Sequence, residues 1–136
     1  MNSYLLEGFP VLILELVLTS MDLNSNIKNK IRTHAERVFP EECCGFLIES
    51  DQGDVKVIEC KNVSEEKETL FKISIDEYLQ ALTEGDIYAV YHSHTKGENS
   101  FSDADKTVSE SLELVSILYN TSNESFEILE PEIEDE

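Results

Sequence analysis

The residue types that most often bind metals gather in one stretch, YHSHTKGENSFSDADK, which spans residues 91–106. It holds two of the three histidines of the chain, His92 and His94, together with Asp105. A catalytic zinc ion takes about three protein ligands and leaves one position for water, and imidazole and carboxylate groups are among its usual ligands. The stretch therefore predicts a metal site; the alternative is a strand followed by a solvated polar loop.

Metal-assisted hydrolysis needs further groups beside the ligands. A carboxylate near the metal takes the proton from the attacking water and passes it to the leaving amine. Glu41 and Glu42 open the run PEECCGFLIE, and Glu42 is the better candidate for this base because it directly precedes the apolar residues. Ser102 is the candidate donor of a hydrogen bond to the oxyanion that forms when water attacks a carbonyl.

Alternation in the run IYAVYHSH, residues 87–94, predicts a strand. Both histidines then point to one face, about two strand rises apart, so they can share one ion. Asp105 follows a loop at the start of a predicted helix, where Ser102 and Asp105 resemble a capping pair. The alternation assigns seven side chains to two faces: Ile87, Ala89 and Tyr91 on one, and Tyr88, Val90, His92 and His94 on the other.

The region before the histidines predicts a helix and a hairpin. Apolar residues recur every three or four positions between Asn24 and Val38, with Asn24 or Ser25 as the cap. His34 lies on the polar part of this helix and is expected to be a surface histidine. The runs CCGFLIES and VKVIEC, joined by DQGD, predict two strands and a tight turn.

Between this hairpin and the histidine strand, LFKI predicts a short strand, and a helix begins at the cap Ser74 and ends at Gly85. The runs LVSILYN and SFEILEP predict the closing strands. Strands and helices alternate irregularly. This pattern favours an α/β fold in which a mixed sheet carries helices on its faces.

Composition argues against two classes of partner. The 136 residues contain 10 basic and 29 acidic side chains, which give a formal net charge of −19. Such a chain repels phosphate backbones and anionic lipid headgroups, so we expect it to bind neither nucleic acid nor a membrane surface. Residues 130–136 form an acidic tail, which is expected to be solvated; the alternative is a tether for a basic partner.

The cysteines and the first residues carry less information. Cys43, Cys44 and Cys60 suggest no disulfide framework, and we expect small buried side chains on strands in a reducing compartment. Residues 1–20 are an apolar extension of uncertain role. The run FPVLILELVLTSM is interrupted by Glu15 and is too short to cross a bilayer, so a buried strand or a partner-binding segment is expected.

Taken together, these residues resemble the JAMM motif of the JAB/MPN+ (Mov34-type) zinc metalloproteases. The motif is a glutamate, then His-x-His, then Ser-x-x-Asp, and the similarity extends over residues 27–128. The resemblance implies a mixed, curved β-sheet flanked by helices, classed as cytidine-deaminase-like, with residues 21–129 as the JAB/MPN+ domain. It also implies hydrolysis of peptide or isopeptide bonds.

The same resemblance implies a role for each motif residue. His92, His94 and Asp105 would be ligands of Zn²⁺, Glu42 would be the general base, and Ser102 would stabilise the tetrahedral intermediate. The family usually has proline after the second histidine, where this chain has Thr95. Because proline would stiffen the exit from the strand, threonine is expected to leave a looser loop and a lower rate.

Within the family, PEECCGFLIE and FKISIDEYLQA most resemble the JAB domain of phage tail assembly proteins of the lambda K type. That resemblance implies a tail-associated peptidase, located in the virion tail or the cytoplasm. The substrate would be a tail protein, a peptidoglycan peptide or a ubiquitin-like carrier.

Two alternatives stay open. One is a structural or interaction module of a phage tail or a similar assembly that retains the zinc site without turnover. The other is a prokaryotic isopeptidase acting on ubiquitin-like or sulfur-carrier proteins. Ubiquitin-specific members carry long insertions near the active site, whereas residues 60–71 and 94–102 are short here.

Overall fold

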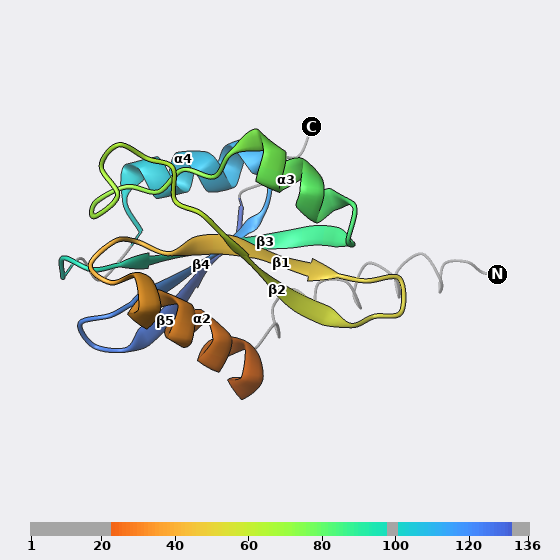
Figure 1. Ribbon diagram of the computed structural model, residues 1–136, viewed down its shortest axis with the longest axis horizontal. Coiled ribbons are helices and arrows are strands. Elements are labelled where there is room, and N and C mark those ends of the chain that lie inside the picture. The colour runs from red at the N-terminus through yellow and green to blue at the C-terminus, as the bar shows by residue number, and fades with distance from the viewer. Residues whose placement is uncertain (1–22, 98–100, 132–136) are drawn as a thin grey trace, which may run out of the picture.

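The computed structural model describes residues 23–97 and 101–131. Within them, five strands form one sheet that helices flank on both sides (Figure 1). The helices are α2 (Ser25–Val38), α3 (Ile75–Leu82) and α4 (Asp103–Leu112). The strands are β1 (Cys44–Glu49), β2 (Val55–Cys60), β3 (Asp86–His94), β4 (Val115–Asn120) and β5 (Ser125–Leu129).

The sheet is mixed and has the strand order β2-β1-β3-β4-β5. Strands β3 and β4 are parallel, and every other neighbouring pair is antiparallel. Parallel neighbours need a crossover connection, and α4 supplies it between β3 and β4. The predicted α/β class, with a mixed sheet and flanking helices, is confirmed.

Each face of the sheet has its own apolar core. Helix α2 covers one face, and α3 and α4 cover the other (Figure 1). The core under α2 includes Ile27, Ile31, Ala35, Leu47, Tyr91 and Ile117. The core under α3 and α4 includes Cys44, Phe46, Ile48, Ala81 and Val90. By alternation along β3, His92 shares the second face with Val90.

The predicted caps are largely confirmed. Asn24 Oδ1 accepts from the Ile27 N–H at 2.8 Å, and Ser74 Oγ accepts from the Glu77 N–H at 3.2 Å. The predicted end of α3 at Gly85 is wrong, because α3 ends at Leu82. Gly85 instead lies where a Cβ atom would be 2.6 Å from the Glu49 carbonyl oxygen, so it permits a close approach to the end of β1.

The predicted alternation is correct from Ala89 to the end of β3, but it is wrong for the residues before Ala89. Tyr88 packs with the core under α2, and Ile87 packs with the opposite core. The register explains the exchange: Leu47 pairs with Ala89, but Ile48 pairs with Ile87. One extra residue in β3 forms a bulge there, and a bulge reverses the faces on one side of it.

The prediction that His34 is a surface residue is wrong. Its side chain is buried, and Nδ1 lies 2.7 Å from Tyr91 Oη. His34 follows Ile31 by three positions, so it borders the apolar stripe of α2. Gly45 pairs with Tyr91 across the sheet and has no side chain, which leaves room for the phenol ring to reach His34.

The predicted strand LFKI is also wrong, because residues 70–73 form no strand. The buried side chain of Asn62 organises this region. Its Nδ2 donates to the carbonyls of Glu42 and Leu70, each at 3.0 Å, and its Oδ1 accepts from the Lys72 N–H at 3.2 Å. An amide side chain therefore makes hydrogen bonds that a neighbouring strand would otherwise make.

All three cysteines are buried and free, as predicted. Burial raises the pKa of Cys43 and of Cys60 to about 12, so both stay neutral thiols that pack as small apolar groups. The expectations for residues 1–20 lie outside the described residues, as does most of the acidic tail.

Candidate metal centre

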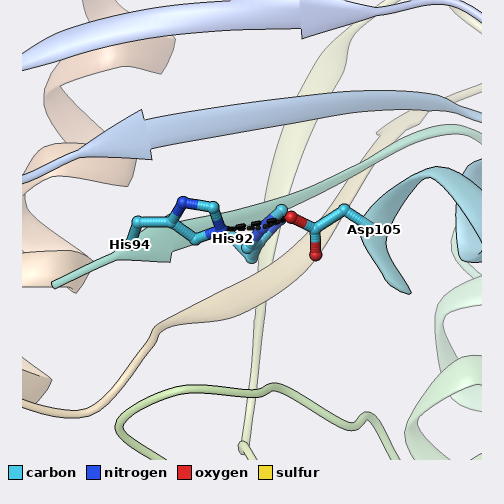
Figure 2. Close-up of side chains that lie close together, drawn as sticks. All are labelled: His92, His94 and Asp105. Atoms are coloured by element: carbon cyan, nitrogen blue, oxygen red, sulfur yellow. Dashed lines mark hydrogen bonds and ion pairs between the residues drawn. The ribbon is translucent and has the colours of Figure 1, made fainter. Parts of the chain in front are cut away.

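Three buried side chains meet at the end of β3 (Figure 2). His92 and His94 come from β3, and Asp105 comes from the first turn of α4. The two Nε2 atoms lie 3.3 Å apart, and Asp105 Oδ2 lies 3.2 Å from His92 Nε2 and 3.1 Å from His94 Nε2. Side chains that are separated by a loop in the sequence therefore point three ligand atoms at one position.

These separations fit a tetrahedral metal ion. Zinc bonds to nitrogen or oxygen of about 2.0–2.1 Å place neighbouring tetrahedral ligand atoms about 3.3 Å apart. The three measured separations are close to that value. Two imidazoles and one carboxylate are also a donor set that zinc takes, with one tetrahedral position left for water. The residues present therefore fit a catalytic type of metal site.

The electrostatics of the cluster favour the ligand forms of these groups. Burial lowers the pKa of His92, although hydrogen bonding to Asp105 opposes that effect. Burial would raise the pKa of Asp105, but hydrogen bonds from His92 and His94 outweigh it and hold that pKa below its usual range. Metal ligation needs a neutral imidazole and an ionised carboxylate, so both shifts have the required sign.

The helix start at α4 positions Asp105. The Asp105 N–H donates to Ser102 Oγ at 3.1 Å, and the Ser102 N–H donates to Asp105 Oδ2 at 2.8 Å. This is the reciprocal capping arrangement predicted from the sequence. The oxygen that accepts from Ser102 is the same oxygen that faces the two histidines. Ser102 is exposed, and a hydroxyl that accepts a hydrogen bond can still donate its proton.

Glu42 is buried beside the same strand end. Its N–H donates to the Lys67 carbonyl at 2.8 Å, and its carbonyl accepts from Asn62. Cys44 pairs with His92, so the same register continued by two residues brings Glu42 opposite His94 and on the same face. The backbone of the predicted base is thus fixed next to the candidate metal ligands.

Residues 24–129 match the Prok-JAB family, described as prokaryotic homologs of the JAB domain. The match covers most of the 136 residues. The chain belongs to the Prok-JAB family.

One curated relative of this Prok-JAB domain is a phage protein. Tail tip assembly protein K of Escherichia phage N15 is 32% identical over 76 residues, which are 56% of this chain and 31% of that protein. The chain therefore spans less than a third of the length of that relative. The match supports the relation to phage tail proteins that the sequence motifs indicate.

Two solution structures share the fold. Protein DSY2949 from Desulfitobacterium hafniense has a TM-score of 0.62 at 17% identity, and covers 83% of this chain and 92% of its own. A protein from Salinibacter ruber has a TM-score of 0.52 at 20% identity, and covers 81% and 88%. At these identities the likeness shows the fold alone.

No helix in residues 23–97 or 101–131 has the length and hydropathy needed to cross a membrane.

Two polar residues that the motif search missed hold the Prok-JAB site in place. Ser93, between the ligand histidines, accepts from the Cys43 N–H at 2.8 Å and donates its own N–H to the Cys43 carbonyl at 3.2 Å. Asn62 ties the Glu42 carbonyl to the following loop. Ser93 is buried between two predicted ligands, and a serine at that place in a buried strand is a signal that the sequence offers; no such signal marks Asn62, which contacts the predicted base.

Phe71 was also missed as a site residue. Its ring stacks on His92 with a centroid distance of 4.6 Å and an interplanar angle of 21°. Metal-binding histidines usually donate the second ring nitrogen to an acceptor. His92 Nδ1 is buried and has no hydrogen-bond partner among the described residues, so the ring is held by its stacking on Phe71 and by the contacts of Nε2 with His94 and Asp105.

Thr95 replaces the expected proline and is tethered by other means. Its Oγ1 lies 3.0 Å from the Pro40 carbonyl oxygen and 3.2 Å from the Glu68 carbonyl oxygen, both of which can accept its proton. Lys96 adds an ion pair with the Glu68 carboxylate at 2.8 Å. These side-chain contacts join the exit from β3 to two other loops, and the expected lower rate stays a prediction.

Proposed function

We propose that this Prok-JAB domain is a zinc-dependent peptidase of the JAMM type. It would hydrolyse a peptide or isopeptide bond in a protein or peptide substrate. The observation that carries the proposal is the convergence of His92, His94 and Asp105 at tetrahedral ligand separations, with Glu42 buried beside them. The Ser102 and Asp105 cap supports it further, because it brings a hydroxyl to the same cluster.

Each residue would have one task. His92, His94 and Asp105 would hold Zn²⁺, which would supply a Lewis acid for polarising a carbonyl and lowering the pKa of a bound water. Glu42 would accept the proton of the attacking water and then deliver it to the leaving amine. Ser102 would donate a hydrogen bond to the oxygen that gains negative charge. The backbone hydrogen bonds of Glu42 to Lys67 and Asn62 support this role, because they hold the residue in one place.

A role in phage tail assembly is the biological setting that the relation to tail tip assembly protein K supports. The domain would then act in the host cytoplasm or in the virion tail. A tail protein is the substrate that best fits that setting.

The direct test pairs Glu42 with its neighbour. Wild type, Glu42→Gln and Glu41→Gln, each loaded with zinc, are incubated with a mixture of unstructured peptides and with tail proteins, and products are identified by mass spectrometry. Removal of a general base costs about 10²–10⁴-fold in rate. We expect Glu42→Gln to lose that much activity while it keeps zinc, and Glu41→Gln to cleave like wild type.

Cleavage by wild type should stop with a chelator and return with zinc. Cleavage that persists in the chelator, or a Glu42→Gln variant as active as wild type, would contradict the proposal. If wild type cuts no substrate but holds zinc, the non-catalytic tail module becomes the better account.

A further inference from the structure

An apolar groove lies beside the metal centre on the face that α3 and α4 cover. Its volume is about 370 Å³, and most of its lining is aliphatic or aromatic. The lining includes Phe46, Phe71, Ile73, Ile75, Tyr78 and Val90. Leu112, at the end of α4, also lines it. A groove of this size and composition is typical of a binding site for an apolar group.

The groove is continuous with the metal centre. Phe71 lines the groove and stacks on His92, so one ring belongs to both. Val90 precedes His92 by two positions on the same face of β3. The groove therefore lies about 7 Å from His92, measured along the strand. An extended peptide advances about 3.3 Å per residue, so this distance corresponds to two residues.

Two apolar side chains at the rim of the groove are exposed to solvent. Ile75 is 71% exposed and Leu112 is 44% exposed. Both contribute to the lining, from the start of α3 and the end of α4. An apolar side chain that enters the groove would therefore remove apolar surface from water on both partners, which is favourable.

On its other side, the metal centre is bordered by acidic rather than apolar residues. A second hollow is lined by Glu41, Glu65, Glu66 and Glu68, with two lysines. It adjoins the site, since the Glu42 N–H bonds to Lys67 and Thr95 lies against Glu68. Together with the net charge of −19, these acids disfavour an acidic peptide on this flank.

We infer that the groove is a specificity site for a bulky apolar side chain of the substrate. This inference rests on the proposed peptidase function and names its substrate class: an extended, non-acidic peptide with an aromatic or large aliphatic residue about two positions from the bond that is cut. Phe71 links the recognition of that side chain to the ring of a metal ligand.

A binding measurement tests this assignment without turnover. Two labelled peptides, identical except for Phe or Ser at one position in a Gly- and Lys-containing background, are titrated into zinc-loaded Glu42→Gln protein and followed by fluorescence anisotropy. Burial of a Phe side chain predicts that the Phe peptide binds roughly tenfold tighter or more. Ile75→Lys should remove most of that preference.

Leu79→Lys is the matched control, because Leu79 is an exposed apolar residue of the same helix that does not line the groove. It should keep the preference. Equal binding of the two peptides, or the same loss in Leu79→Lys as in Ile75→Lys, would overturn the inference. If the preference is present but wild type cleaves neither peptide nor any other substrate, the peptidase proposal fails while the groove assignment stands.

Discussion

On the face of the sheet under α2, His34 is buried against a phenol; on the opposite face, His92 is buried against a histidine and a carboxylate. In the first arrangement Nδ1 pairs with the Tyr91 hydroxyl, while Nε2 lies 4.0 Å from the Glu59 carboxylate, which Arg37 already binds. The second points three ligand atoms at one position. His34 and His92 are thus both buried in different chemical surroundings, and burial alone does not identify a metal ligand.

The strand β3 connects the two arrangements, because Tyr91 and His92 are neighbours that face opposite sides. Tyr91 anchors β3 to α2 through His34, and His92 belongs to the candidate metal centre. We therefore expect substitutions under α2 to change the free energy of unfolding and to leave zinc binding largely intact. Substitutions of the candidate metal ligands on the other face should mainly change zinc binding.

The largest loss of stability is expected from Gly45→Ala. A Cβ atom there would collide with the Ile58 carbonyl oxygen and lie 2.5 Å from Tyr91 Cε2. Neither β2 nor the Tyr91 ring can move away without loss of pairing or packing, so overpacking should cost about 3 kcal/mol or more in unfolding free energy. Urea denaturation measures this cost.

Gly53→Ala is the control, since a Cβ there would contact nothing within 4 Å but the backbone has a φ of +87°. It should cost only about 1–2 kcal/mol of backbone strain. A Gly45→Ala protein as stable as Gly53→Ala would contradict the close approach of Tyr91 to β1.

Tyr91→Phe should have the next largest effect. The variant keeps the ring but removes the hydroxyl that partners His34 Nδ1, and leaves a buried nitrogen without its hydrogen bond. Such a loss costs about 1–3 kcal/mol of unfolding free energy. Zinc content, measured by mass spectrometry, should stay at the wild-type level.

Tyr88→Phe is the matched control because Tyr88 is half-buried in the same core. It should change stability less than Tyr91→Phe. Loss of zinc in Tyr91→Phe would show that the two faces are not independent.

Thr95→Val should have the smallest effect. The substitution keeps the branched shape and removes the hydroxyl that reaches the Pro40 and Glu68 carbonyls. One hydrogen bond of this kind contributes about 0.5–1.5 kcal/mol. Thr95→Ser should retain most of that stability, and a Val variant as stable as wild type would mean that the exit from β3 does not depend on this contact.

Much of this architecture follows from local pattern. The apolar spacing predicts α2, the hairpin and the closing strands, and the capping pair Ser102 and Asp105 predicts the start of α4. The same local rules place His92 and His94 on one face of β3, so the metal-binding cluster follows from the sequence once Asp105 is added. The catalytic roles of Glu42 and Ser102 stay predictions.

What the sequence does not predict depends on contacts between distant residues. The bulge in β3 exchanges the faces of Ile87 and Tyr88, and only its pairing with β1 reveals it. His34 is buried because Gly45, on another strand, lets Tyr91 reach it. The extended run after Leu70 pairs with the Asn62 side chain instead of a strand. No periodicity within a segment encodes these choices.

The most direct test of the metal site compares two buried histidines, one from each face of the sheet. His92→Ala and His34→Gln are purified alongside wild type, checked for folding by circular dichroism, and analysed for bound metal after dialysis against zinc. We predict about one zinc per chain in wild type and in His34→Gln, and none in a folded His92→Ala protein. Tyr91→Phe replaces His34→Gln if that variant does not fold. Zinc retained by His92→Ala, or absent from wild type, would contradict the account.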